Sequence, residues 1–392
     1  MKILSVNAGS SSLKFQAYEM PEEKVLISGT FERIGIDASF YTIKINGEKI
    51  KKEVDLKDHK EAVRILTEEL LNYHVVEDLS EIKGVGHRVV HGGDIYAQSV
   101  KIDEDVIKVL HDLSSLAPLH NPANIIGIKA FEAIIPDAIQ VGVFDTAFHE
   151  TIEKDRFLYP VPYEWYKSFF VRKYGFHGTS HKYISQRVAD IMNRSDLKVI
   201  SCHIGNGGSI SAIKNGKCID TSMGFTPNAG IMMGSRSGDI DVTLIPHVMA
   251  NTGMSLDEVI NDLNKKSGLL GISEVSSDFR DVLASIKEGN EQASLARTMY
   301  IERVVDYIAR YYVELGGCDV IVFTAGVGEN NADIRKDILT RLAVFGIEVD
   351  ETMNANADGE TLITTPESKV AAYVIPTDEE VMIARDTFSF IQ

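Results

Sequence analysis

The sequence contains few cysteines and no long apolar segment. Its three cysteines, Cys202, Cys218 and Cys318, lack the spacing of a zinc or redox site, and an odd number cannot all form disulfides. We therefore expect reduced thiols and a cytoplasmic protein. No segment approaches the roughly 18 apolar residues of a transmembrane helix, and the apolar segment before Asn7 is too short for a signal peptide. The sequence thus predicts no membrane partner.

Several common catalytic motifs are also missing. No G-x-x-x-x-G-K-S/T segment is present, which excludes a P-loop protein. The Gly326-Val327-Gly328 segment lacks the third glycine of a dinucleotide fingerprint. No G-x-S-x-G segment occurs, and the His149-Glu150 pair lacks the second histidine of a zinc-binding helix.

Length and charge limit the remaining classes. A chain of 392 residues is long enough for two or three domains, and 44% hydrophobic with 25% charged residues is typical of a soluble globular protein. The formal net charge of −17 argues against nucleic acid or an anionic membrane as the main partner. A small anionic substrate stays possible because a few arginines and lysines can dominate one local site.

A strand–turn–strand pattern occurs once in each half of the chain. In the first copy, a strand beginning at Ile3 leads to Asn7 and to a turn containing Gly9. In the second copy, a strand beginning at Val199 leads to His203 and the turn 205–207. Turns of glycine and small polar residues can direct several N–H groups and hydroxyls at one phosphate. The repeat suggests two related domains that close on the phosphates of a nucleotide.

Hydrophobic periodicity and turn residues predict alternating strands and helices in both halves. We expect strands at 2–7, 12–18, 41–45, 49–54, 83–90, 140–144, 198–203, 209–214 and 319–324, and helices at 58–73, 121–134, 177–191, 291–315, from near 332 and after Pro376. This order predicts an α/β protein with two similar domains. Asn121 is a candidate N-cap with Pro122 at the first helical position. The apolar stripe of the 291–315 helix is interpreted as core or as a subunit contact.

The chain has no obvious linker between its halves. We expect the hinge between Asp145 and about Ile152, and we expect the last helix to return to the first domain. The predicted N-terminal domain comprises residues 1–147 and 382–392, and the predicted C-terminal domain comprises residues 148–381.

Charged or titratable residues stand out at four places in the sequence, three of them among glycines. Arg88 lies within the segment 86–93 and Arg236 within 234–241, and either guanidinium can clamp a carboxylate or phosphate or form a structural ion pair. Asp145 follows a predicted strand, where α/β proteins place catalytic residues, although an aspartate there can also cap a helix. His177 can donate to a developing negative charge, or the segment can simply cap a helix through Thr179 or Ser180.

Taken in their order along the chain, these segments closely resemble the acetate kinase family, within the actin and sugar-kinase superfamily. The resemblance runs from Ile3 to Asp386 and is carried by the segments 7–14, 87–93, 144–149, 175–181, 220–227, 323–330 and 377–380. The chain departs from the family pattern at the pair Asn228-Ala229, where Leu-Glu is more usual, and at Asp378 and Val242, where Asn and Pro are frequent. The first departure leaves the preferred acyl chain open.

The resemblance implies a fold and a reaction. The fold is two similar α/β domains of the actin/sugar-kinase (ribonuclease H-like) type with a cleft between them. The reaction is direct in-line transfer of the ATP γ-phosphoryl group to acetate, giving ADP and acetyl phosphate, with Mg²⁺ or alternatively Mn²⁺. A carboxylate is ionised at neutral pH, so the nucleophile needs no general base. The family also implies a homodimer.

The resemblance assigns roles to individual residues. The implied catalytic residues are Asp145, Arg88, Arg236 and His177, and Arg88 also binds acetate beside an apolar pocket of Val90, Leu119 and Pro227. The implied nucleotide-binding residues are Ser10, Ser12, Lys14, His203, Asn206, Gly207, Asp278, Phe279, Arg280, Gly326, Val327 and Asn330. The implied magnesium partners are Asn7, Glu379 and Asp145, directly or through water.

Other functions stay open at this point. A propionate kinase would share nearly every motif and the same mechanism, whereas the segments 144–149 and 177–181 resemble acetate kinases more than butyrate kinases. A protein of a different class is a non-catalytic nucleotide-binding switch on an actin-like fold. Such a switch would have no reason to keep together all four of Arg88, Asp145, Arg236 and Glu379.

Overall fold

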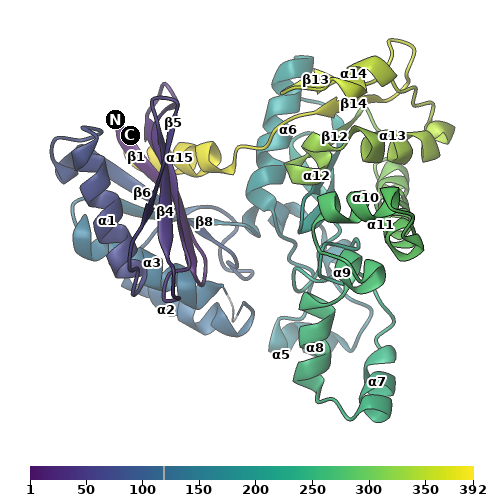
Figure 1. Cartoon of the computed structure of the whole chain (residues 1–392), viewed down its shortest axis with the longest axis horizontal. Helices are drawn as coiled ribbons and strands as arrows, with labels where there is room; N and C mark the ends of the chain where they lie inside the picture. Colours follow the sequence, from purple (N-terminus) through teal and green to yellow (C-terminus); the bar gives the residue numbers. More distant parts are fainter. Residues whose placement is uncertain (118–119) are drawn as a thin grey trace. The chain divides into compact units, whose positions relative to one another are not determined.

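The computed structural model describes residues 1–117 and 120–392 and divides into two compact units (Figure 1). Unit 1 comprises Met1–Phe148 and Asp378–Gln392, and unit 2 comprises His149–Thr377. The domain boundaries at 147/148 and 381/382 stay predictions. Within the described residues, no helix is both long and apolar enough to cross a membrane.

Unit 1 contains a sheet of eight strands in the order β5-β4-β3-β2-β1-β6-β8-β7. The strands are β1 (Lys2–Ala8), β2 (Ser12–Glu19), β3 (Lys24–Glu32), β4 (Phe40–Ile45), β5 (Glu48–Glu53), β6 (Ile82–Val89), β7 (Val100–Lys101) and β8 (Ile139–Phe144). β1 to β5 form an antiparallel meander, whereas β1, β6 and β8 are parallel neighbours. The carboxyl ends of β1, β6 and β8 therefore meet at one edge of the sheet.

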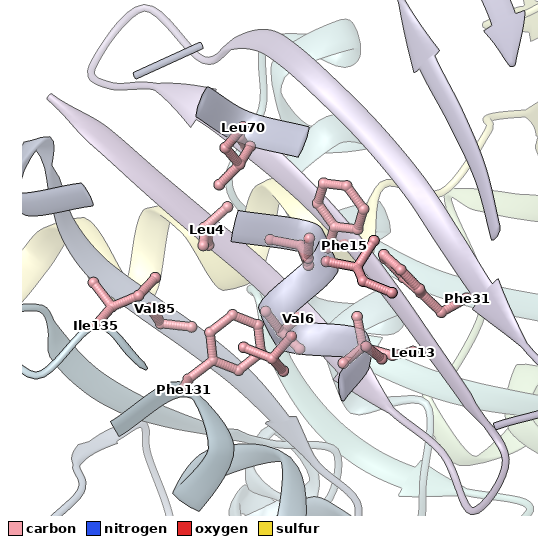
Figure 2. Close-up of a cluster of buried hydrophobic side chains, with 14 of the residues drawn as sticks. Leu4, Val6, Leu13, Phe15, Phe31, Leu70, Val85, Phe131 and Ile135 are labelled. Atoms are coloured by element: carbon pink, nitrogen blue, oxygen red, sulfur yellow. The ribbon is translucent and has the colours of Figure 1, made fainter. Parts of the chain in front are cut away.

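Helices cover both faces of this sheet. The helical segments of unit 1 are α1 (His59–Asn72), η1 (Leu79–Glu81), α2 (Glu104–Asp112), η2 (Leu113–Ser115), α3 (Asn121–Ile134) and α15 (Glu379–Ser389). Side chains such as Leu4, Val6 and Val85 point toward α1 and α3 and form the main core of the unit (Figure 2). Because side chains alternate along a strand, Gly84 and Gly86 face the opposite side.

The residues Gly84 and Gly86 allow α15 to pack closely on the second face. A Cβ atom on Gly86 would lie 2.2 Å from Thr387 Oγ1 and 2.5 Å from Ile383 Cγ2. Ile383 also packs with Val141 and Val143 of β8. The last helix therefore completes the core of unit 1, as Figure 1 shows by its yellow ribbon among the purple strands.

Unit 2 contains a six-stranded sheet in the order β11-β10-β9-β12-β14-β13. The strands are β9 (Lys198–Ile204), β10 (Gly208–Lys214), β11 (Lys217–Thr221), β12 (Val320–Thr324), β13 (Thr361–Leu362) and β14 (Ala371–Val374). β9 and β10 are antiparallel, whereas β9, β12 and β14 are parallel. This is the arrangement of β1, β2, β6 and β8 in unit 1, so the two copies of the strand–turn–strand pattern occupy equivalent places in the two sheets.

Helices also surround the sheet of unit 2. The helical segments are η3 (Ala147–Thr151, shared with unit 1), α4 (Lys154–Phe157), α5 (Tyr163–Phe169), α6 (Gly178–Met192), α7 (Leu244–Thr252), α8 (Leu256–Lys265), α9 (Gly268–Ser273), α10 (Phe279–Lys287), α11 (Glu291–Glu314), α12 (Ala325–Asn330), α13 (Ala332–Arg341), η4 (Ala343–Phe345) and α14 (Glu351–Ala355). α6 contacts β9, and α11 contacts both β9 and β10. Val304 and Ile308 of α11 are fully buried, so much of its apolar stripe is core.

The predicted strands and helices are confirmed to within about two residues at their ends. The Asn46-Gly47 turn joins β4 and β5 with positive φ angles of 50° and 81°, as a tight hairpin turn requires. One detail was wrong: the N-cap of α3 is His120, and Asn121 lies inside the helix. The Asn121 side chain instead accepts from His91 N and donates to His91 O, which fixes the segment after β6.

Candidate functional site

Arg88 and Asp145 form an ion pair at the edge of the unit 1 sheet. Arg88 lies near the end of β6, and Asp145 directly follows β8, its parallel neighbour. Arg88 Nε donates to Asp145 Oδ1 at 3.2 Å and Nη2 donates to Oδ2 at 2.5 Å. Arg88 Nη1 lies 3.5 Å from Oδ1 of Asn7, near the end of β1. The three parallel strands thus bring together three predicted site residues.

Glu379 adds a further carboxylate to this group. It is the first residue of α15, and its Oε2 lies 3.9 Å from Arg88 Nε. Burial, followed by the nearby Asp145 and Glu380 carboxylates, raises the pKa of Glu379 although Arg88 acts against the shift. Burial also tends to lower the pKa of Arg88, but these acidic neighbours outweigh it and raise the pKa above its ordinary value. Arg88 therefore stays charged.

The oxygen atoms of this group fit a hard cation. No cluster of three or more His, Cys, Asp and Glu side chains capable of holding a metal occurs in the described residues. The predicted set of Asn7, Asp145 and Glu379 instead offers amide and carboxylate oxygens around one arginine. Mg²⁺ prefers oxygen ligands and usually keeps several waters, so few protein ligands suffice. Burial and, to a lesser extent, the Asp145 and Glu380 carboxylates raise the pKa of Glu379, and a bound cation would favour its ionised form.

The first turn presents its polar residues at the surface. Ser10, Ser12 and Lys14 are exposed, and Lys14 forms an ion pair with Glu380 of α15. Gly9 N donates to Ser12 O at 2.8 Å, which closes the turn. A Cβ atom on Gly9 would lie 2.8 Å from Ser12 Oγ, so a larger residue would crowd the turn.

The three residues predicted to form the acyl pocket are described one by one. Val90 is buried in unit 1, and its N–H donates to Asn124 Oδ1 at 3.2 Å. Pro227 belongs to unit 2, where its carbonyl accepts a 2.7 Å hydrogen bond from Arg236 Nη1. Leu119 lies outside the described residues.

The second turn gathers the predicted phosphate-binding residues of unit 2. Gly205 N donates to Gly207 O at 3.0 Å, and Gly234 N donates to Asn206 O at 2.8 Å. A Cβ atom on Gly207 would lie 2.9 Å from Arg236 Nη2 and 3.8 Å from His177 Cε1. The glycine therefore leaves room for a guanidinium and an imidazole directly beside the turn.

Arg236 is a half-buried cation of unit 2. No carboxylate among the described residues forms an ion pair with it, and burial lowers its pKa from the ordinary value. Its pKa is nevertheless high enough that the guanidinium stays charged at neutral pH. A half-buried cation without a counter-ion is unfavourable, so this position favours the binding of an anion.

His177 and His203 lie side by side in unit 2. Their rings stack with centroids 4.2 Å apart, and His177 adopts a left-handed backbone conformation with φ 58°. His177, and neither Thr179 nor Ser180, is the N-cap residue of α6, without a side-chain cap. Ser180 Oγ instead lies 2.8 Å from His203 Nδ1 and 2.7 Å from Thr377 Oγ1. The sequence predicts for Ser180 only a capping role, because its contacts to His203 and Thr377 join residues that are distant in the chain.

The predicted adenosine-binding residues begin two helices near this turn. Asp278 caps α10 by accepting from Arg280 N at 2.8 Å, and it also pairs with the exposed Arg280 guanidinium. Phe279 is buried and packs edge-on against Tyr300, with ring centroids 5.0 Å apart.

Close contacts join these helices to the second turn. A Cβ atom on Gly234 would lie 1.8 Å from Asn206 Oδ1 and 2.7 Å from Ser277 O, just before α10. A Cβ atom on Gly205 would lie 3.8 Å from Gly326 N in α12. Val327 is buried in α12, and Asn330 Nδ2 donates to Gly326 O at 2.9 Å. The starts of α10 and α12 therefore flank the turn.

The model of the Acetokinase family matches residues 2–385. The chain belongs to the acetokinase family. It is 53% identical to the acetate kinase of Bacillus subtilis (strain 168) over 387 residues, which cover 98% of each chain.

Solved structures agree with this membership. The crystal structure of Porphyromonas gingivalis acetate kinase matches with a TM-score of 0.95 at 45% identity, covering 100% of both chains. The structure of a propionate kinase from Francisella tularensis matches with a TM-score of 0.94 at 40% identity, covering 99% of both chains.

Membership in the acetokinase family confirms the predicted fold class, two α/β units of the actin/sugar-kinase type. It also confirms the predicted enzyme class, a phosphotransferase with a carboxyl group as acceptor, and acetate kinase as the activity. The alternative of a non-catalytic switch is therefore set aside. The roles of individual residues stay predictions.

Proposed function

We propose that this acetate kinase transfers the γ-phosphoryl group of ATP directly to acetate in a magnesium-dependent, reversible reaction. One carboxylate oxygen of acetate bonds to the γ-phosphorus while the bond from that phosphorus to the β,γ-bridging oxygen breaks. The bond electrons leave with ADP, so no proton needs to move. The proposal rests on the position of Arg236. This cation has no acidic partner in the described residues and lies beside Gly207 of the turn 205–207.

In unit 2, the chain supplies charge and hydrogen bonds to the nucleotide. Arg236 neutralises the equatorial oxygens of the transferring phosphoryl group, and His177 adds a hydrogen bond there. His203, Asn206 and Gly207 contact the phosphates. The adenosine is bound by Asp278, Phe279, Arg280, Gly326, Val327 and Asn330.

In unit 1, the chain binds the acceptor and the cation. Arg88 holds the acetate carboxylate, and Ser10, Ser12 and Lys14 contact phosphate. Asn7, Asp145 and Glu379 hold Mg²⁺, directly or through water, and Mn²⁺ is an alternative. When bound, the ion neutralises negative charge on the phosphate oxygens.

The acyl group is selected by size. We assign recognition of the methyl group of acetate to the apolar residues Val90, Leu119 and Pro227, as the family resemblance implies. One additional methylene changes binding by only about 1–3 kcal/mol in an apolar pocket, so some activity with propionate is expected. The similarity to the structure of the Francisella tularensis propionate kinase makes this second acceptor worth measuring.

We also propose a cytoplasmic homodimer. The three cysteines, all within the described residues, form no disulfide, as in a reducing compartment. In and next to α5, the side chains of Tyr163, Trp165, Phe169 and Phe170 are between 47% and 64% exposed. Exposed apolar side chains gathered in this way are typical of an interface, and a second copy of the chain would cover them. Sedimentation of a Phe169→Glu variant tests this, because a dimer through this segment should dissociate.

The reaction is tested by trapping the acyl phosphate with hydroxylamine. The enzyme is incubated with MgATP and either acetate, propionate, butyrate or glycerol. Acyl hydroxamate with the highest kcat/KM for acetate supports the proposal, and a maximum at propionate would reassign the acceptor. No hydroxamate with any acid, while ATP still binds, would refute it.

A further inference from the structure

Four side chains of unit 2 form a continuous row of hydrogen bonds. His181 Nδ1 lies 2.8 Å from Ser201 Oγ, and His181 Nε2 lies 2.8 Å from Ser209 Oγ. Ser209 Oγ also lies 2.9 Å from His177 Nδ1. Ser201, His181 and Ser209 are fully buried, and the row ends at the half-buried His177.

The fold places these residues on one face of the sheet. Ser209 of β10 pairs with His203 of β9, so Ser209 and Ser201 point to the same face because side chains alternate along β9. α6 contacts β9 and carries His181 one turn after His177, whose carbonyl accepts from His181 N at 3.0 Å. Buried serines on two strands make less apolar contact than aliphatic residues would, which suggests that their hydroxyls have a role.

His181 must be neutral in this environment. Burial, followed by the neighbouring His149 and His203 rings, holds the pKa of His181 well below its ordinary value. Only one of its two ring nitrogens therefore carries a proton. The two serine hydroxyls determine which nitrogen that is.

The direction of each hydrogen bond follows from Ser201. Among the described residues, the Ser201 hydroxyl has no other hydrogen-bond partner than His181 Nδ1. If Nδ1 were the donor, the buried Ser201 proton would have no acceptor, which is unfavourable. Ser201 therefore donates to Nδ1, and His181 donates from Nε2 to Ser209.

The same reasoning continues to His177. The Ser209 oxygen already accepts from His181, so its own proton is directed to His177 Nδ1. A neutral His177 ring must then carry its proton on Nε2.

We infer that Ser201, His181 and Ser209 form a positioning relay that keeps the proton of neutral His177 on Nε2, where it can be donated to the transferring phosphoryl group. The inference rests on the proposed function, in which His177 acts on that group. No proton is transferred along the relay. Its effect is to prevent the other tautomer, whose Nε2 lone pair would repel the phosphoryl oxygens.

The test measures the tautomer directly. The full chain is labelled with ¹⁵N-histidine, and the ring nitrogen shifts are recorded without nucleotide at neutral pH, with His177 assigned by comparison with a His177→Gln variant. The wild type should show a protonated Nε2 and an unprotonated Nδ1 at His177. In Ser209→Ala, Nδ1 should shift toward the protonated value, and kcat should fall about tenfold or more while KM for ATP changes little.

Three further variants make the test specific. Ser209→Thr keeps the hydroxyl and should restore both tautomer and kcat. Ser201→Ala removes the hydroxyl that donates to His181 Nδ1. It should therefore change the His177 tautomer although residue 201 does not contact His177. Ser211→Ala is the matched control, because Ser211 is equally buried on the same strand face but bonds to Thr221. It should change neither the tautomer nor kcat.

The outcomes separate the relay from the reaction. A wild-type spectrum with the His177 proton on Nδ1, or an unchanged tautomer in Ser209→Ala, overturns the relay even in an active enzyme. A wild-type protein that shows the Nε2 tautomer but forms no acyl hydroxamate overturns the proposed function and with it the role given to the relay.

Discussion

Arg88 donates hydrogen bonds to both carboxylate oxygens of Asp145 and so connects the ends of β6 and β8. Asp145 is only 1% exposed, so the pair is largely shielded from water. Removal of one partner leaves the other charge buried without compensation, which typically costs about 3 kcal/mol or more. The pair therefore bears on the stability of unit 1 as well as on chemistry.

The first prediction concerns this pair. Arg88→Ala should lower kcat by orders of magnitude, because acetate loses its cation, and should also destabilise unit 1. The double variant Arg88→Ala/Asp145→Ala should be destabilised by less than the sum of the single variants. Hydrogen exchange of β6 amides reports stability, and hydroxamate formation reports kcat. Arg64→Ala, in an exposed ion pair on α1, is the control, and a kcat of Arg88→Ala within tenfold of wild type would remove Arg88 from the mechanism.

The second prediction concerns Arg236. Arg236→Ala should lower kcat by roughly 100-fold or more, because the charge that develops on the phosphoryl group is no longer neutralised. Arg236→Lys should recover part of this loss, since an ammonium supplies charge without the planar fork. Arg303→Ala changes an exposed arginine of the same unit and should leave kcat unaltered. Equal kcat values for the two alanine variants would contradict the role of Arg236.

The third prediction concerns the contact between β6 and α15. Gly86→Ala introduces a Cβ atom 3.1 Å from the Ile383 carbonyl oxygen as well as against two side chains of α15. The helix must move, and unit 1 should lose about 1–3 kcal/mol of unfolding free energy. Activity should fall too, because Glu379 begins the same helix.

Gly142→Ala on the adjacent strand β8 is a matched control for this change. A Cβ atom there would lie 3.4 Å or more from its neighbours, an ordinary contact distance. Chemical denaturation of both variants should show a loss only for Gly86→Ala. Equal stability of the Gly86→Ala and Gly142→Ala variants would mean that α15 shifts to accommodate the added methyl group at no measurable cost.

The fourth prediction concerns pH. Burial lowers the pKa of His87 to about 4, although the hydrogen bond to Gln140 acts in the opposite direction. The pKa in the unfolded chain is about 6.5, so the unfolded state binds more protons between pH 4 and 6.5. Acid should therefore lower the free energy of unfolding across this window, by about 3 kcal/mol in total from this residue.

A His87→Gln variant isolates this contribution. Its free energy of unfolding should fall less steeply than that of the wild type between pH 6.5 and 4. His111→Gln, which replaces an exposed histidine of the same unit, should follow the wild-type slope. Parallel curves for wild type and His87→Gln would mean that His87 is not held neutral by the fold.

The fifth prediction concerns the cation. Glu379→Gln should raise the Mg²⁺ concentration required for half-maximal activity by about tenfold or more, since one anionic oxygen is lost. Glu22→Gln, at an exposed position of unit 1, should not change it. Titration of each metal-stripped variant with Mg²⁺ gives the values, and identical titrations would separate Glu379 from the metal.

Much of the fold follows from local patterns in the sequence. The hairpin at Asn46-Gly47 and the helix after Asp58 are set by residues close in the chain, and both were predicted within about a residue. α12 was missed because its sequence, Ala325–Asn330, contains two glycines and favours no helix. Contacts from the next helix stabilise it, because the buried Arg335 of α13 donates to the Gly328 and Glu329 carbonyls at 2.9 and 2.8 Å.

The candidate site was only partly visible in the sequence. Arg88 and Asp145 each stand at a strand end, but their contact depends on β6 and β8 being neighbours, which no local pattern gives. Ser201 and Ser209 lie within predicted strands, and for the same reason no local pattern marks them as residues of a site. Their importance appears only when β9, β10 and α6 are assembled and His181 lies between them.

The place of α15 in unit 1 has a consequence for synthesis of the chain. Residues 378–392 cover the sheet face around Gly84 and Gly86, yet the ribosome makes them after all of His149–Thr377. Unit 2 is continuous in sequence and can fold as soon as it has emerged from the ribosome. One face of the unit 1 sheet stays uncovered until α15 has been synthesised. Nascent chains of this protein should therefore complete their second unit before their first and depend most on chaperones during that interval.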